Sequence, residues 1–332
     1  MCSGTGNIGW MIASAVPMET ESIDMTMKVV NSVPKRLYKY LEFNERTLES
    51  LVHDVLHFAD PSKFNDPLDT RPSLEVDVEE GKLREILRVL VEQRVGDEMT
   101  KALRTAKIRG PRAAEYTERQ SRRLADRDLR KVEYYATDSD AGDLKSLLGH
   151  KIEIELLRRY PGGIVCLGER ATCPVMWSHY GEDHKGICIG YSVPEATTVH
   201  QVKYGGSRSI KASTVAAMLT ESDDARREVD DAVLLRKASP WRYEREWRLL
   251  GRQGGNLSAL ELEEVVFGVK CSDTVKYVVI KALKDRERHV EFFEVRETPG
   301  RFQLRKGRVY AQELLALLPT RGLSIFDGFD QV

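Results

Sequence analysis

The stretch Gly186-Ile-Cys-Ile-Gly-Tyr191 is short and mainly apolar, and a run of this kind predicts a buried strand. The run Ile164-Val-Cys-Leu167 has the same character, and residues 198–204 alternate in the manner of a third strand. Helical patterns interrupt the strands without a regular strand–helix–strand repeat. The sequence therefore predicts an α+β fold around a mixed or antiparallel β-sheet.

Further elements are expected on both sides of these strands. An aromatic and basic strand at 34–40 precedes a helix at 45–58, where apolar residues recur at helical spacing. We expect other strands at 241–250, 262–269, 290–295 and 302–310, and other helices at 211–237 and 275–283.

Local composition and periodicity also indicate how the chain is divided. Residues 1–33 contain five methionines and are interpreted as a flexible leader. Residues 34–310 are expected to form a single α+β domain of catalytic type. Within it, residues 79–160 combine helical spacing with many cations, which predicts a basic helical insertion. Residues 311–332 are expected to form a C-terminal helix and tail.

Composition excludes several classes of protein. Of the 332 residues, 41% are hydrophobic and 31% are charged, which is ordinary for a globular protein and excludes a disordered or collagen-like chain. The 51 Lys and Arg balance 52 Asp and Glu to a net charge of −1. This balance argues against a protein that coats nucleic acid with its whole surface, although a local basic face is compatible with it.

Cysteine and histidine usage argues against disulfide, redox and metal chemistry. The five cysteines are an odd number and form no Cys-x-x-Cys pair. His179 and His184 lack an obvious third ligand nearby, so no metal site is expected. No stretch approaches the ~18 apolar residues of a membrane span. We therefore expect a cytoplasmic protein with reduced thiols and no contact with a membrane.

The segment Trp241-Arg-Tyr-Glu-Arg-Glu-Trp-Arg248 carries the strongest candidate for catalysis. On a strand, Glu244, Glu246 and Arg248 would share one face, with the two carboxylates about 7 Å apart. One carboxylate could then polarise a hydroxyl while the other faces a developing cation. The alternative is an edge strand whose alternating charges pair with its neighbours.

Two other segments could bind a flat, phosphorylated ligand. Trp177, His179 and Tyr180 place aromatic faces close together, and Ser178 adds a small hydroxyl, which suits a nicotinamide or adenine ring. The alternative is an aromatic corner of the core. Tyr38-Lys39-Tyr40 could offer a cation to a pyrophosphate, or could be a first strand with a solvated lysine.

The segment Trp177–Tyr180 does not favour a Ser–His–Asp triad. Ser178 and His179 are neighbours and would point apart on a strand, and no Gly-x-Ser-x-Gly turn is present.

Four motifs in order along the chain resemble the bacterial family known as domain of unknown function 2971 (DUF2971). These motifs are Leu37-Tyr-Lys-Tyr40, Phe64-Asn-Asp-Pro-Leu-Asp69, Met176-Trp-Ser-His-Tyr180 with His184-Lys-Gly-Ile-Cys-Ile-Gly190, and Trp241-x-Tyr-Glu-x-Glu-Trp-Arg248. They span about 210 residues, and their combination is more specific than any one of them. The family name implies no chemistry.

A looser resemblance does imply chemistry. An aromatic and basic first strand, a central strand bearing a serine and a late Glu-x-Glu strand are similar to the three-element site of ADP-ribosyltransferases, which have a split β-sheet. This resemblance implies that Tyr38 or Lys39, with Tyr40 beside them, holds the ribose or phosphates of NAD. It implies that Ser178 and Tyr180, with Trp177 and His179, frame the nicotinamide. Glu246 would be the catalytic carboxylate and Glu244 the substrate-side one.

The leading hypothesis is therefore an NAD-dependent ADP-ribosyltransferase-like enzyme that modifies a protein or a nucleic acid. The resemblance further implies a bacterial toxin or phage-defence effector, with a neutralising antitoxin as a conceivable partner.

Two other hypotheses stay open. Residues 101–131 hold eleven Lys or Arg and four acids, a local charge of +7, which suits a nucleic-acid-binding module or a nuclease. Its candidate contact residues are Arg119, Arg122, Arg123 and Arg127. The alternative is that residues 101–131 form a solvated helix in which side chains of opposite charge pair four residues apart. The last hypothesis is a non-catalytic sensor or adaptor.

Overall fold

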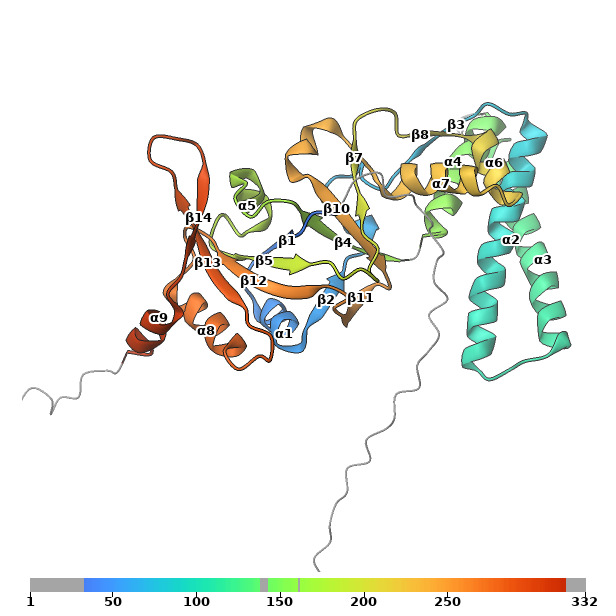
Figure 1. Cartoon of the computed structure of the whole chain (residues 1–332). Helices are drawn as coiled ribbons and strands as arrows, with labels where there is room; N and C mark the ends of the chain where they lie inside the picture. Colours follow the sequence, from blue (N-terminus) through green and yellow to red (C-terminus); the bar gives the residue numbers. More distant parts are fainter. Residues whose placement is uncertain (1–32, 138–142, 161, 321–332) are drawn as a thin grey trace, which may run out of the picture.

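A twisted β-sheet forms the centre of the protein (Figure 1), and the computed structural model describes residues 33–137, 143–160 and 162–320. In this described part the sheet has eight strands, and adjacent strands run antiparallel except for the parallel pair β12 and β13. The strands in spatial order are β14 (Leu304–Arg308), β13 (Glu291–Glu297), β12 (Glu261–Phe267), β5 (Ile187–Ser192), β1 (Leu37–Leu41), β4 (Gly163–Gly168), β10 (Glu246–Gly251) and β6 (His200–Gln201). The predicted α+β class with a mixed, largely antiparallel sheet is confirmed.

One face of the sheet carries the main apolar core. Side chains alternate between the faces of a strand, so Leu37 of β1, Ile189 of β5 and Trp247 of β10 point to the same side. Helices α1 (Glu45–His53) and α8 (Asp273–Leu283) pack on this side. Burial of this face drives the assembly of strands that are far apart in the sequence.

A short helix, α5 (Pro174–Tyr180), covers the opposite face. The expectation of a central strand at these residues is wrong. Pro174 suits the first turn of a helix, where its missing N–H is not needed, and the helix buries Trp177 while it exposes Ser178 and His179. The five residues of the Met176–Tyr180 motif are too few for the sequence pattern to separate the period of two of a strand from the period of 3.6 of a helix.

Five helices share a second core at one end of the sheet (Figure 1). They are α2 (Glu80–Thr105), α3 (Pro111–Tyr135), α4 (Leu144–Arg158), α6 (Ala212–Leu219) and α7 (Asp223–Leu234). The long helices α2 and α3 form a hairpin that projects away from the sheet. These helices occupy much of the predicted insertion at 79–160, whose division from the rest of the chain stays a prediction. The expected helix at 211–237 is wrong in its length, because it breaks at Glu221, which has a φ of 67°, before Ser222 caps α7.

Three two-stranded ladders complete the described strands. They are β2 (Val55–Phe58) with β11 (Gly254–Leu257), β3 (Ser73–Glu75) with β8 (Ser209–Lys211), and β7 (Lys203–Tyr204) with β9 (Arg236–Lys237). The helix expected at 45–58 ends at Asp54, whose φ of 55° turns the chain into β2. The short elements η1 (Pro61–Lys63), η2 (Ser239–Glu244) and α9 (Ala311–Leu317) lie between or after the strands.

Some predictions fall on residues that the structure does not describe. Residues 1–32 of the expected leader and residues 321–332 of the expected C-terminal tail lie outside the described residues. Among the described residues, none of the helices has both the length and the apolar character that crossing a membrane requires.

Candidate functional site

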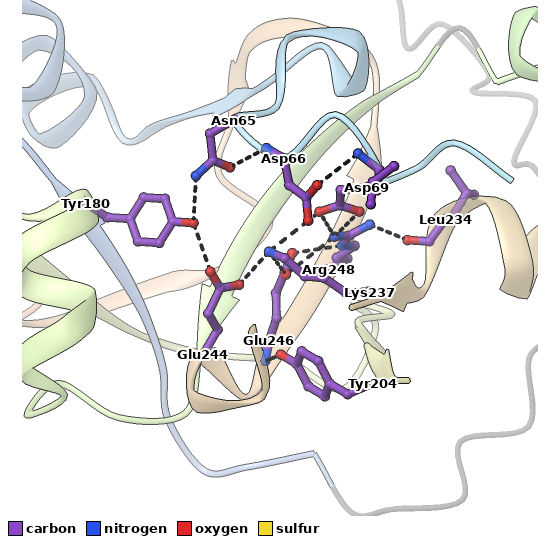
Figure 2. Close-up of polar contacts among 11 residues, drawn as sticks. Asn65, Asp66, Asp69, Tyr180, Tyr204, Leu234, Lys237, Glu244, Glu246 and Arg248 are labelled. Atoms are coloured by element: carbon purple, nitrogen blue, oxygen red, sulfur yellow. Dashed lines mark hydrogen bonds and ion pairs between the residues drawn. The ribbon is translucent and has the colours of Figure 1, made fainter. Parts of the chain in front are cut away.

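Five charged side chains meet in the interior beside strand β10 (Figure 2), and we call them the charge network. The network consists of Asp69, Lys237, Glu244, Glu246 and Arg248, and every member is buried. Charged groups are seldom fully buried unless they are paired, so a cluster of five is unusual.

Two sharp backbone features bring the carboxylates together. Glu244 ends the 3₁₀ helix η2, Arg245 adopts the left-handed region at a φ of 45°, and Glu246 then begins β10. The expectation that Glu244 and Glu246 share one continuous strand is therefore wrong. The turn at Arg245 nevertheless points both carboxylates at the same partner.

Lys237 is that partner, at the end of β9. Its Nζ donates to Glu244 Oε2 at 2.5 Å and to Glu246 Oε2 at 2.9 Å. The same Nζ lies 3.5 Å from Oδ2 of Asp69. One ammonium group therefore joins the neighbouring carboxylates of Glu244 and Glu246 to that of Asp69, which is far away in the sequence.

Arg248 holds the network from the other side. Its Nε donates to Glu246 Oε1 at 2.8 Å, and its Nη2 donates to both oxygens of Asp69 at 2.9 and 2.8 Å. Its Nη1 donates to the backbone carbonyl of Leu234 at 2.6 Å. The ring of Phe64 lies 5.6 Å from the guanidinium carbon. Arg248 thus orients two carboxylates with charge-assisted hydrogen bonds.

The network holds three acids and two bases, so one negative charge is left over if every group is ionised. Burial acts to raise the pKa of Glu246, but Arg248 and Lys237 together hold this pKa well below its usual value. For Glu244 burial prevails over the attraction of Lys237, and its pKa is raised. Glu244 is therefore the carboxyl of this pair that takes up a proton more readily.

Glu244 also connects the network to a group of aromatic rings. The hydroxyl of Tyr180 donates to Glu244 Oε1 at 2.8 Å, and the side-chain amide of Asn65 donates to the Tyr180 oxygen at 3.3 Å (Figure 2). Both burial and the neighbouring Glu244 raise the pKa of Tyr180, so its hydroxyl keeps its proton.

The ring of His179 lies next to those of Tyr180, Trp241 and Tyr243, and we call these four rings the aromatic group. The His179 ring is 6.1 Å from that of Tyr180, 6.1 Å from that of Trp241 and 6.4 Å from that of Tyr243. Lys237 Nζ lies 5.1 Å from the Trp241 ring, which places this ring next to the charge network. His179 is exposed and the other three rings are half-buried, so a ligand can reach them.

An open cavity of about 380 Å³ reaches Glu246. Its lining residues are Glu169, Gln201, Val202, Tyr204, Arg242, Arg245 and Glu246. The exposed side chains of Arg242 and Arg245 bring two cations to a lining that also holds the carboxylates of Glu169 and Glu246, and Arg245 lies 3.5 Å from Glu169. The Tyr204 hydroxyl accepts the backbone N–H of Glu246 at 2.7 Å (Figure 2). An anionic group such as a phosphate would suit this cavity.

The structure separates several residues that the sequence had grouped. Lys39 alternates with Tyr38 and Tyr40 and pairs with Ile189, so it points to the face opposite Glu246. It therefore does not face the charge network. Burial and the adjacent Glu264 raise the pKa of Tyr38, which lies near a different ion pair, between Glu264 and Lys306.

Trp177, Ser178 and Tyr40 also lie away from the carboxylates. The indole of Trp177 is fully buried and donates to the carbonyl of Ala171 at 2.8 Å. Tyr40 packs edge-on against it at 5.1 Å, in an aromatic core corner. Ser178 Oγ lies 3.2 Å from the carbonyl of Pro174 and 3.1 Å from His184 Nε2. Of the expected nicotinamide-binding residues, Tyr180 contacts Glu244 directly, and His179 lies next to the Tyr180 ring.

Sequence reasoning missed part of the site. Asp69 lies in the Phe64–Asp69 motif, to which the sequence assigned no chemistry, and Arg248 was expected only to share a strand face with Glu244 and Glu246. No pattern in the sequence pointed to Lys237. A tertiary contact between residues 179 positions apart, such as Asp69 and Arg248, leaves no local pattern.

The comparisons with known proteins agree with one of the resemblances. Residues 176–249 match the family model described as "Protein of unknown function (DUF2971)", which confirms over this segment the resemblance to that family found in the sequence. The matched segment begins at α5 and ends in β10, and so holds Tyr180, Lys237, Glu244, Glu246 and Arg248. No curated protein matches the chain, and no solved structure matches it. Within the described residues no group of three or more His, Cys, Asp or Glu is placed to hold a metal ion.

Proposed function

We propose that this protein is an NAD-dependent ADP-ribosyltransferase-like enzyme whose carboxylate chemistry centres on Glu244. The observation that carries the proposal is the hydrogen bond from Tyr180 to Glu244, because it joins a buried carboxylate to the aromatic group. Glu246, the carboxylate favoured from the sequence, is surrounded by Lys237 and Arg248 and is better suited to position its neighbours.

The residues fit the three chemical parts of NAD. The exposed ring of His179, with Trp241 and Tyr243 beside it, offers flat surfaces for a nicotinamide or adenine ring. Arg242 and Arg245 offer exposed cations for the pyrophosphate. The Tyr180 hydroxyl donates a hydrogen bond to Glu244, and a ribose hydroxyl would bind this carboxylate in the same way.

The chemistry follows from the charge that develops during the reaction. The bond between nicotinamide and ribose breaks, its electron pair goes to the nicotinamide nitrogen, and the ribose carbon becomes an oxocarbenium-like cation. A carboxylate near that carbon stabilises the cation, and aromatic walls exclude water that would capture it. A nucleophile of the acceptor then forms the new bond at this carbon and loses its proton to solvent or to a nearby base.

Lys237 and Arg248 would act as positioning residues. They keep Glu246 ionised, hold the carboxylate of Asp69 in place, and fix the side of the network on which Glu244 lies. Groups held in place before the reaction need no reorganisation as charge develops, and the loss of one such group lowers a rate by about 10²–10³. The acceptor is proposed only as a protein or a nucleic acid, and the role as a bacterial toxin or phage-defence effector remains part of this proposal.

The test is release of nicotinamide and transfer of label from NAD that is labelled in its adenosine part, with the full-length protein and a cell lysate. Glu244→Gln is expected to lower both signals by about 10²–10³. Glu155→Gln is the matched control, because Glu155 is also buried and ion-paired, to Arg94 and Arg158 in the helical region. The proposal fails if the native protein transfers no label, or if Glu244→Gln turns over NAD as the control does.

A further inference from the structure

Helix α3 has one face that packs and one face that does not. Its buried residues are Thr117, Ser121, Ala125, Leu129 and Val132, which recur every three or four positions and face α2 and α4. The α2–α3 hairpin projects from the rest of the molecule (Figure 1), so the opposite face of α3 is turned to solvent.

That outer face carries a row of arginines. At about 100° per residue, positions separated by 7, 4, 4 and 3 residues fall on one side of a helix. Five exposed arginines follow this spacing, and we call them the arginine stripe: Arg112, Arg119, Arg123, Arg127 and Arg130. From Arg112 to Arg130 the stripe is about 27 Å long, at about 1.5 Å per residue.

The arginines of the stripe form few ion pairs. Among the described residues, Arg127 has the one ion pair of the stripe, a distant one of 3.7 Å to Asp128. Other acids of α3 bond to bases off the stripe, Glu118 to Arg122 and Asp126 to Arg88. A solvated helix with internal charge pairs would show the opposite arrangement.

The tip of the hairpin extends this positive charge. Residues 99–114 contain no acid, and their side chains are largely exposed. Their cations are Lys101, Arg104, Lys107, Arg109 and Arg112.

Two exposed tyrosines lie in the same row. Tyr116 is 46% exposed and Tyr134 is 75% exposed, which is high for rings that could bury apolar area. By the same helical spacing Tyr116 lies between Arg112 and Arg119, and Tyr134 lies one turn beyond Arg130. The Arg119 guanidinium carbon lies 5.9 Å from the Tyr116 ring. Flat rings between cations match a strand whose bases are free to stack while its phosphates meet the arginines.

We infer that the arginine stripe, with Tyr116 and Tyr134, is a binding site for single-stranded nucleic acid. The bases of a duplex are already stacked on one another, so a duplex could use the arginines but not the rings. This site is separate from the charge network and does not depend on the proposed transferase activity. Of the residues selected from the sequence, Arg119, Arg123 and Arg127 belong to it, and Arg122 does not.

The test uses the full-length protein and fluorescein-labelled 20-nucleotide poly(U) and poly(dT), with anisotropy measured over a salt series. Each phosphate contact contributes about −0.7 to the slope of log affinity against log salt for a single strand. Five contacts predict a slope of about −3.5, which is about a 100-fold loss of affinity between 50 and 200 mM salt. Binding to either strand with such a slope supports the inference.

Two double variants distinguish the contribution of the arginine stripe to binding from the effect of net charge alone. Arg119→Gln with Arg123→Gln is expected to reduce the magnitude of the slope by about 1.4. Arg122→Gln with Lys131→Gln removes the same charge from exposed positions on the flanks of α3, and is expected to leave the slope unchanged. Equal effects in the two double variants would overturn the site.

The tyrosines decide the kind of nucleic acid. Tyr116→Ala and Tyr134→Ala are each expected to weaken poly(U) or poly(dT) binding by about tenfold and to leave binding of a 20-base-pair duplex unchanged. Tighter binding of the duplex than of either single strand, or tyrosine variants that bind as the native protein does, would overturn the assignment to single strands.

Discussion

Replacing Lys237 with methionine removes the ammonium that three buried carboxylates share. Lys237 is almost completely buried and lies within 3.5 Å of Asp69, Glu244 and Glu246. Removing one partner of a buried ion pair costs about 3–5 kcal/mol, because the remaining charge has lost both water and its counterion. At neutral pH we expect the free energy of unfolding of Lys237→Met to fall by about this amount.

The loss should depend on pH, and its sign follows from Glu244. Burial already raises the pKa of Glu244, and without Lys237 this pKa rises further in the folded state. Between the ordinary carboxyl pKa and the raised one, the folded variant binds a proton that the unfolded chain does not. Its stability therefore increases as the pH falls through this window, by up to about 1.4 kcal/mol per pH unit.

Urea denaturation at pH 7.5 and 5.5, followed by the fluorescence of the fully buried Trp177 and Trp247, measures both effects. Lys203→Met is the matched control, because Lys203 donates to Asp231 at 2.8 Å but is 65% exposed. Surface pairs contribute about 0–1 kcal/mol, so this variant should unfold almost as the native protein does. The reasoning is refuted if the two variants are equally stable, or if the deficit of Lys237→Met is the same at both pH values.

Two further predictions concern the charge network, and a third concerns the backbone just before β5. The depressed pKa of Glu246 stabilises the native protein above the ordinary carboxyl range, so the native protein should lose stability in acid below about pH 4.5. In thermal melts over this pH range, Glu246→Gln should lose less stability than the native protein does. Parallel curves of melting temperature against pH for the two proteins would contradict this. Tyr180→Phe removes the hydrogen bond to Glu244 and should lower the free energy of urea unfolding by about 1–3 kcal/mol; no change would mean that water replaces the hydroxyl at no cost. In Gly186→Ala, the new Cβ would lie 2.2 Å from the carbonyl oxygen of Leu41, so its melting temperature should fall clearly, and an unchanged one would show that the chain can relax there.

Local pattern was enough to predict strands at 186–191 and 164–167, which form as Ile187–Ser192 and Gly163–Gly168, and with them the α+β class. Short apolar runs that are rich in β-branched residues and have glycines at or near their ends favour strands that are buried on both faces. Pattern failed where the backbone turns at single residues. Asp54 and Arg245 adopt the left-handed region although neither is glycine, so the sequence contained no signal for these breaks.

The candidate site shows the same division. The sequence alone identified Glu244, Glu246, His179 and Tyr180 as chemically promising, because acidic and aromatic side chains were concentrated in two short segments. It also grouped Trp177 and Lys39 with them, since a list of residue types does not say which face of a helix or strand each one occupies.

Only the tertiary structure decided which of these groups meet. Lys237 and Asp69 joined the carboxylates because burial leaves an ionised group no water, so each charge must find a partner wherever the fold brings one. Charge pairing across 179 residues depends on the packing of the whole chain, whereas the periodicity of a strand depends on its immediate neighbours. That difference in range is why the elements could be predicted from the sequence and the charge network could not.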